Sequence, residues 1–287
     1  MKWNEMRQSE NVEDERSGSS RPGSRPLVGS VGIGSIAIAL IAGLIFRVNP
    51  LEILGLISSS SKAPAPQAET KPINDRDAAF VKSVLGDTED IWGRIFKQQL
   101  NTPYRAPKLV LFRDGVNSAC GSAQTTSGPF YCPADRKVYL DMAFFEHIQA
   151  TASPDADFAK AYAIAHEVGH HVQTVLGTSD KVRQLQASSS KTKANDLSVR
   201  TELQADCYAG VWGHYTVQRG LIGDRDVAAA LDTATQIGDD YLQRQARVNV
   251  VPESFTHGSS QQRVKWFKQG LQTGDIAQCD TFATNRL

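Results

Sequence analysis

Two histidines four residues apart, with a glutamate directly after the first, are the clearest chemical signal in the sequence. Residues 166–170 read His-Glu-Val-Gly-His. On a helix, positions i and i+4 lie on one face, so His166 and His170 can each turn a ring nitrogen toward a common ion. Zn²⁺ is held by such nitrogens at about 2.0–2.1 Å. Glu167 can reach a water on that ion without binding the ion itself, as a general base in peptide hydrolysis must.

A third metal ligand is expected from a second helix, because a catalytic zinc ion has three protein ligands and one open position. Residues 200–210 read RTELQADCYAG, which places Glu202 and Asp206 four positions apart on one face. We expect Glu202 to complete the ligand set and Asp206 to accept a hydrogen bond from the distal nitrogen of a ligating histidine. The small residues Gly169 and Ala205 would let the two helices come close. The alternative interpretation is an ordinary solvated helical face.

A hydrogen-bond donor near the open position would stabilise the negative charge that develops on the attacked carbonyl oxygen. His257 is the first candidate for this catalytic role, and Tyr131 and Tyr208 are the others. Each also fits an ordinary role, a turn before a helix for His257 and a core position for the tyrosines. The other histidines stand alone and are expected at the surface or in the core: His147, His171 and His214.

The elements that must position these residues follow from the pattern of apolar residues. Phe, Ala, Tyr, Val and Leu at helical spacing around the first motif predict a helix over residues 155–176. Residue Glu202 falls in a second predicted helix, 195–219. The other predicted elements are helices at residues 76–99, 224–246 and 260–273, and strands at residues 108–112 and 137–140. A small sheet followed by a mainly helical remainder predicts an α+β fold.

Charge and composition exclude one class of partner. The 287 residues carry 31 Lys+Arg against 31 Asp+Glu, for a formal net charge of zero. A protein that binds nucleic acid usually has a basic excess to neutralise phosphates, so we expect no nucleic-acid partner. Apolar residues make up 40% of the chain, enough for most of it to bury a core.

The four cysteines are expected to form two disulfide bonds. Cys120 and Cys132 are close in sequence, so we predict that they pair and leave Cys207 to pair with Cys279. Four cysteines permit three pairings in all. No two cysteines stand as C-x-x-C, which disfavours a thiolate zinc site. Disulfide bonds persist in an oxidising compartment.

The N-terminal part of the chain differs in composition from the rest. Residues 27–46 read LVGSVGIGSIAIALIAGLIF, without a charge. A helix of this length spans about 30 Å, the hydrocarbon thickness of a bilayer. We predict a transmembrane anchor there, after a disordered cytoplasmic tail at residues 1–26 and before a linker at residues 47–74 and a globular domain at residues 75–287. A cleaved signal peptide is the main alternative.

Flanking charges predict the orientation of this anchor in a bilayer. Arg16, Arg21 and Arg25 precede the apolar run, and only Arg47 closely follows it. Positive residues favour the cytoplasmic side, so we expect a cytoplasmic N-terminus and an extracytoplasmic domain, on the periplasmic or extracellular side. Small residues at four-residue spacing would allow a homodimer through the anchor, although such residues are also ordinary in membrane helices: Ser35, Ala39 and Gly43.

These motifs, together with HGSSQQRVKWFKQG near the C-terminus, resemble the bacterial neutral zinc metallopeptidase family. Its members are membrane-anchored HExxH proteins of the gluzincin type, and the resemblance covers about Trp92 to Phe282. It implies a zincin-like domain with one catalytic Zn²⁺. His166, His170 and Glu202 match the family's ligand positions. Two further residues match the family's motif. The resemblance implies that Glu167 is the catalytic base and that Asp206 is the carboxylate that supports a ligating histidine.

The resemblance also suggests where a substrate would bind. Zincins bind an extended substrate along an edge strand beside the active helix, by main-chain pairing. Residues 121–124 are our candidate strand, with Gly121, Ser122 and Ala123 as substrate-binding residues. The alternative is an ordinary loop bridged by a disulfide bond.

We therefore expect a membrane-anchored zinc endopeptidase whose partners are a peptide or protein substrate and the lipid bilayer. In this hypothesis, Glu167 takes a proton from a zinc-bound water and passes it to the leaving amine. One alternative is a non-proteolytic zinc-containing binding or regulatory module at the cell envelope. A third hypothesis is a metal hydrolase that acts on a non-peptide bond.

Overall fold

The computed structural model describes most of the chain outside one long N-proximal segment. The described residues are 1–16, 75–113, 115–124, 128–151, 156–284 and 287. The predicted anchor at residues 27–46 lies outside them. Within the described ranges, no helix combines the length and apolar character needed to cross a bilayer.

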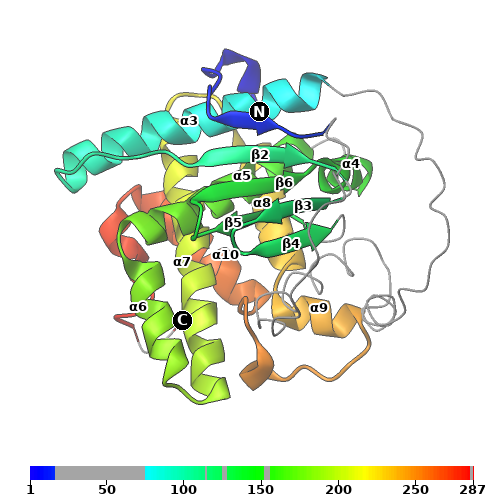
Figure 1. Cartoon of the computed structure of the whole chain (residues 1–287), viewed down its shortest axis with the longest axis vertical. Helices are drawn as coiled ribbons and strands as arrows, with labels where there is room; N and C mark the ends of the chain where they lie inside the picture. The colour runs from blue at the N-terminus through cyan, green and yellow to red at the C-terminus, as the bar shows by residue number, and fades with distance from the viewer. Residues whose placement is uncertain (17–74, 114, 125–127, 152–155, 285–286) are drawn as a thin grey trace.

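A four-stranded sheet forms one layer of the molecule, with strand order β1-β2-β6-β5 (Figure 1). Strands β1, β2 and β6 are parallel, and β5 runs antiparallel to β6 at the other edge. A separate antiparallel hairpin, β3-β4, follows β2 in the chain. The bounds are β1 (Val12–Asp14), β2 (Lys108–Phe112), β3 (Gly115–Ser118), β4 (Gly121–Gln124), β5 (Phe130–Cys132) and β6 (Lys137–Asp141). The predicted strand at 108–112 is confirmed, and the one at 137–140 is one residue longer.

The two faces of the sheet are buried against different partners. Side chains alternate between the faces of a strand, so Leu109 and Leu111 belong to the large core shared with the helices. Val110 and Phe112 point the other way, into a small cluster with Val116 of the hairpin. Burial on both faces explains why β2 reads as a continuous apolar run after its first residue.

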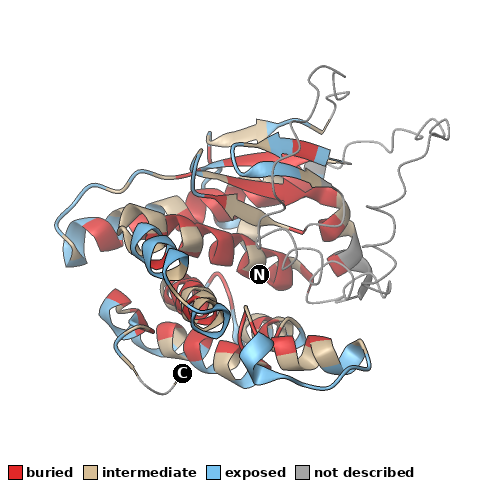
Figure 2. Ribbon diagram, turned by 60° about the horizontal axis from the view of Figure 1, so that its bottom comes forward, coloured by how far each residue is buried: buried red, intermediate tan, exposed pale blue. Residues whose placement is uncertain are grey.

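Helices form the second and larger layer, and α5, most of whose residues are buried, lies at its centre. Figure 2 shows buried residues concentrated where the sheet and the helices face each other. This helix contacts β5 and β6 on one side and α7 on the other. The helices are α3 (Asp75–Gln99), α4 (Met142–Thr151), α5 (Ala156–Val175), α6 (Thr178–Ala187), α7 (Lys191–Gln218), α8 (Asp224–Gln236), α9 (Asp239–Gln245) and α10 (Ser260–Thr273). The described residues therefore form a mainly helical α+β fold, as predicted.

Small residues set how closely the central helices cross. A Cβ atom placed on Gly169 of α5 would lie 3.0 Å from the carbonyl oxygen of Ala205 in α7. A Cβ on Gly210 of α7 would lie 2.1 Å from the carbonyl oxygen of Phe267 in α10. The predicted close approach of the two motif-bearing helices is thus confirmed.

The predicted helix at 224–246 is wrong in one respect, because it is divided into α8 and α9. The break occurs at Gly238, where a Cβ would lie 2.2 Å from the backbone nitrogen of Ser260. The chain has to pass close to the start of α10 there, and a continuous helix would not allow this. Helices α4 and α6 were not predicted.

The prediction of a disordered N-terminal tail is wrong for residues 1–16. The sequence predicts a disordered tail over residues 1–26, but the first sixteen residues contain a 3₁₀ helix, η1 (Trp3–Glu5), and strand β1. Strand β1 pairs in parallel with β2 and forms the edge of the sheet. The polar and charged composition of this segment suggested disorder. Its charged residues instead form ion pairs with residues of the domain.

Both predicted disulfide bonds are present. Cys120 pairs with Cys132, and Cys207 pairs with Cys279. The first joins the β3-β4 hairpin to β5, and the second joins α7 to the segment that follows α10.

Candidate metal centre

The three predicted ligands converge from α5 and α7. The Nε2 atom of His166 lies 3.2 Å from Glu202 Oε2, and the Nε2 atom of His170 lies 3.5 Å from Glu202 Oε1. One ligand atom from each of the three residues lies within 4.8 Å of the others. Among the described residues, this is the one cluster of three such side chains. His171 and His214, expected to stand alone, do not join it.

These separations fit a tetrahedral zinc ion. Ligand atoms at about 2.0–2.1 Å from a common tetrahedral centre lie about 3.3 Å from one another. The imidazole nitrogens lie 3.2 Å from Oε2 and 3.5 Å from Oε1 of the Glu202 carboxylate, close to this value, and one ligand atom from each residue lies within 4.8 Å of the others. Two imidazoles and one carboxylate are also a donor set that catalytic zinc sites use, with a fourth position left for water.

The distal nitrogen of each histidine is held by another side chain. His166 Nδ1 lies 2.8 Å from Asp206 Oδ1, and His170 Nδ1 lies 2.8 Å from Gln173 Oε1. Both acceptors require a proton on Nδ1, so the neutral form of each ring has its lone pair on Nε2, where a cation can bind. The predicted role of Asp206 agrees with this geometry.

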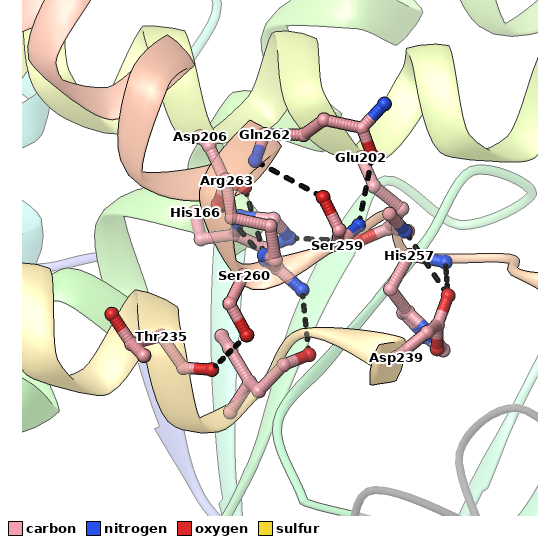
Figure 3. A network of polar contacts seen from close by, with 12 residues as sticks. His166, Glu202, Asp206, Thr235, Asp239, His257, Ser259, Ser260, Gln262 and Arg263 are labelled. Carbon is pink, nitrogen blue, oxygen red and sulfur yellow. Dashed lines mark hydrogen bonds and ion pairs between the residues drawn. The ribbon is translucent and has the colours of Figure 1, made fainter. Parts of the chain in front are cut away.

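Asp206 is fully buried and takes part in a wider network (Figure 3). Its carboxylate accepts two hydrogen bonds from Arg263, at 2.8 and 2.9 Å, and one from the hydroxyl of Tyr162, at 2.5 Å. Burial opposes ionisation, but Arg263 and His166 outweigh it and keep the pKa of Asp206 below its ordinary value. The carboxylate that orients His166 is therefore ionised and itself fixed in place.

The carboxylates also control protonation of the metal-free ligands. Burial opposes a charge on His166, but Asp206 and Glu202 outweigh it and raise the pKa of this imidazole from 6.5 to about 10. Burial is the dominant influence on His170 and lowers its pKa. Burial would raise the pKa of Glu202, but the two neighbouring imidazoles outweigh it and lower the pKa strongly.

Glu167 lies one position beyond the first ligand and faces the sheet rather than solvent. It is 9% exposed, and its carboxylate accepts a hydrogen bond from the backbone N–H of Tyr131 in β5. Burial, reinforced by the charge of Glu202, raises the pKa of Glu167 from 4.5 to about 8. A carboxylate with a raised pKa beside a ligand set is suited to accept and return a proton near neutral pH.

Of the three candidate oxyanion donors, His257 acts electrostatically on a predicted ligand, Glu202, and is held by the carboxylate of Asp239. Its Nδ1 lies 3.1 Å from Asp239 Oδ1 and 3.1 Å from the hydroxyl oxygen of Thr256. Asp239 is anchored in turn by the backbone N–H groups of residues 256–258. His257 acts electrostatically on Glu202, and Figure 3 shows the Asp239–His257 pair on the side of Glu202 opposite Asp206.

The two tyrosines have other partners. The hydroxyl of Tyr131 lies 3.1 Å from His171 Nδ1. Because the other nitrogen of His171 donates to the carbonyl oxygen of Arg105, at 2.7 Å, Tyr131 is the donor to this ring. Tyr208 is buried, with its ring packed edge-on against Trp92 at 5.5 Å. The core interpretation therefore holds for Tyr208.

A cleft of about 400 Å³ opens beside the ligand set, between β5, α6 and α7. Its lining residues are Tyr131, Pro133, His170, Gln173, Ser179, Val182, Arg183, Gln186, Ser198, Thr201 and Glu202. The strand predicted at 121–124 is present as β4, but it pairs with β3. Gly121, Ser122 and Ala123 do not line this cleft, whereas Tyr131 of β5 does.

Three side chains that contact the predicted site residues were not predicted from the sequence. Gln173 follows His170 by three positions on the same helix, a spacing that could have shown it. Arg263 lies within the C-terminal motif, but nothing local marks it as the partner of Asp206. Asp239 had no signal at all, because it was placed inside a continuous predicted helix.

Comparison with known proteins agrees with this geometry. The family model described as "Putative neutral zinc metallopeptidase" matches residues 1–282. A protein of Escherichia coli strain K12 named "Uncharacterized protein YpfJ" is 45% identical over 288 residues, which covers 98% of this chain and 99% of that one. A protein of Mycobacterium tuberculosis strain H37Rv named "Uncharacterized protein Rv2575" is 44% identical over 191 residues, or 63% and 64% of the two chains. No solved structure matches the chain.

Proposed function

Because this chain belongs to the neutral zinc metallopeptidase family, we propose that it is a zinc endopeptidase that hydrolyses peptide bonds with Glu167 as general base. The observation that supports this most directly is the convergence of two Nε2 atoms and one carboxylate at separations of 3.2 and 3.5 Å. A purely structural zinc site has four protein ligands and no use for an adjacent buried carboxylate.

Each side chain has a role that follows from its position. His166, His170 and Glu202 would hold one zinc ion, which when bound polarises the substrate carbonyl and makes its water more acidic. Glu167 takes the proton of that water and delivers it to the leaving amine. His257, held by Asp239, donates a hydrogen bond to the oxygen that becomes negatively charged.

For the substrate we propose the outer edge of β5 as the pairing strand. In an antiparallel strand, the N–H and C=O of one residue point to the same side. The N–H of Tyr131 reaches Glu167 rather than β6, so its C=O also lies on the outer edge. An extended peptide that pairs there would pass directly beside the general base. The β3-β4 hairpin, tied to β5 by the Cys120–Cys132 bond, would extend this edge.

For location, we propose an oxidising, extracytoplasmic compartment for the domain. The described residues contain no free cysteine, and both disulfide bonds would be reduced in a typical cytosol. Attachment to a bilayer through residues 27–46 is a proposal that depends on their apolar character and lack of charge.

The variant Glu167→Gln tests the function. It keeps the size of the side chain and the three ligands but removes the base. We expect zinc content, measured by elemental analysis, to stay at one ion per chain. Cleavage of a diverse peptide library, followed by mass spectrometry, should fall by a factor of about 10²–10⁴.

Two results would contradict this proposal. If the variant cleaves peptides as fast as the parent, Glu167 is not the base. If the parent binds one zinc ion but cleaves no peptide in the library, a non-proteolytic zinc-binding module explains the site better.

A further inference from the structure

Residues 1–16 form an integral part of the domain in spite of the long segment that separates them from it. The backbone N–H of Leu109 donates to the carbonyl oxygen of Asn11, and that of Glu15 donates to Leu111, each at 2.8 Å. Glu13 of β1 bridges Lys108 of β2 and Lys137 of β6, at 2.7 and 2.6 Å. The edge of the sheet therefore carries both backbone and side-chain partners for this strand.

Helix α3 offers a second set of partners. Glu89 accepts hydrogen bonds from Ser9 at 2.6 Å, from Asn11 at 2.7 Å and from Arg7 at 2.7 Å. Its side chain is only 11% exposed, so without these donors its charge would be poorly compensated. Arg7 also pairs with Asp90 at 2.9 Å.

Residues 7–9 pack so closely against α3 that one position of the helix, Gly86, has no room for a side chain. At Gly86 of α3, a Cβ atom would lie 2.3 Å from the carbonyl oxygen of Arg7 and 3.0 Å from the backbone nitrogen of Ser9. Nearby, the ring of Trp3 packs edge-on against the buried Phe80, with centroids 5.7 Å apart. Backbone pairing, charge complementarity and close packing at one place characterise a specific docking site.

We propose that residues 1–16 dock onto α3 and β2 of their own chain, and that they lie on the same side of any membrane as residues 75–287. Groups joined by hydrogen bonds of 2.6–2.9 Å cannot have a hydrocarbon layer of about 30 Å between them. The two ends of the segment 17–74 therefore return to one side. The flanking arginines predict a single membrane crossing between the N-terminus and the domain. The docking of residues 1–16 replaces that prediction. The inference does not depend on what the metal centre catalyses.

The first experiment tests the docking in cells that produce the full-length chain. Arg7 and Asp90 are each about half exposed, 47% and 50%, and the native cysteines in the described residues are all paired. In the double variant Arg7→Cys/Asp90→Cys, a short bifunctional maleimide should join residues 7 and 90 within one chain. Mass spectrometry of the monomer band would identify the joined peptides. The matched control, Arg7→Cys/Asp180→Cys, places the second thiol on the exposed Asp180 of α6 and should give no such product.

The second experiment tests the compartment with single thiols. Arg7→Cys and Asp180→Cys are labelled separately with a membrane-impermeant maleimide, before and after the membrane is opened. Both positions should be labelled in intact cells or both should be protected. If one is labelled and the other protected, the two segments lie on opposite sides and the proposal is wrong. Linkage of residues 7 and 90 only between two chains would also overturn it.

A glycine pair on one helix adds a third test. On the Arg7→Cys/Asp90→Cys background, Gly86→Ala should abolish the cross-link because the new methyl group occupies the place of the Arg7 carbonyl. Gly93→Ala should preserve it, since nothing lies within 4 Å of a Cβ at that position. Equal cross-linking in the two variants would contradict the docking geometry.

Discussion

Replacing Gln173 with leucine tests whether this side chain orients a metal ligand, His170, or only contributes to the packing around it. Gln173 is fully buried, and its Oε1 accepts from His170 Nδ1 at 2.8 Å. Its Nε2 donates to the carbonyl oxygen of Thr201 at 2.7 Å and to Gln204 Oε1 at 3.1 Å. Gln204 in turn donates to the carbonyl oxygen of Cys279 at 3.0 Å. Two amides thus link a metal ligand to the C-terminal segment.

The expected losses of zinc affinity and of stability follow from the hydrogen-bond partners of each amide. Loss of the residue that holds a ligating histidine typically weakens metal binding by a factor of about 10–100, which corresponds to about 1.4–2.7 kcal/mol. Gln173→Leu should therefore raise the zinc dissociation constant by this factor. Unsatisfied buried partners should also lower the free energy of unfolding of the metal-free protein by about 1–3 kcal/mol.

Gln204→Leu is the matched control. It also removes one buried amide from the same chain of hydrogen bonds, so its cost in stability should be similar. Because Gln204 does not contact His170, its zinc affinity should stay close to that of the parent. Zinc affinity is measured by competition against a chelating dye at a fixed pH, and the stability of the metal-free protein by urea denaturation.

Two outcomes would refute this reasoning. Equal loss of zinc affinity in Gln173→Leu and Gln204→Leu would mean that general loosening of the helices, rather than orientation of His170, weakens the site. Unchanged affinity in Gln173→Leu would mean that the hydrogen bond to His170 Nδ1 does not hold the ring in its binding position.

Three further predictions concern protons, the N-terminal segment and the oxyanion donor. Zinc affinity should rise about tenfold or more per pH unit between about pH 6 and 8, because metal binding displaces a proton from His166, whose pKa is about 10 in the metal-free protein. Calorimetric titration with zinc at several pH values measures this dependence. A zinc affinity that does not change with pH would contradict it. Gly93→Ala should stabilise α3 by up to about 1 kcal/mol, as a helical glycine-to-alanine change does, whereas Gly86→Ala should lower the melting temperature. Asp239→Ala and His257→Ala should each reduce kcat by about 10²–10³, and the double variant by no more than the worse of the two, because one residue acts through the other; additive losses would separate their roles.

The metal ligands could be predicted because their spacing is a local property of a helix. His166 and His170 share a face in any fold that keeps α5 helical, and the same holds for Glu202 and Asp206 on α7. The meeting of the two helices required tertiary information, yet Gly169 opposite Ala205 gave a physical reason to expect it. The disulfide pairing followed from the short separation of one pair.

What the sequence did not reveal depends on contacts between distant segments. Gly238 ends α8 because the chain passes Ser260, and only this break places Asp239 where it can hold His257. Strand β1 has three residues, and Glu13 finds Lys108 across 95 positions of sequence. Such a segment is too short and too charged for its own pattern to indicate a strand. Its partners are visible only once the sheet is formed.

The balance of charge at the metal centre explains why two protons should leave when one zinc ion binds. Without metal, Glu202 and Asp206 are ionised, and Arg263 and a proton on His166 compensate them. Glu167, with its pKa raised to about 8, is largely protonated at pH 7 and adds no charge. A divalent cation can replace the protons of His166 and Glu167 with no change in the net charge of this buried region, which avoids the cost of an uncompensated charge. Proton release measured at pH 7 in buffers of different ionisation enthalpy should therefore approach two per zinc ion, and one in Glu167→Gln; a parent protein that releases none would show that the metal-free site is not charged in this way.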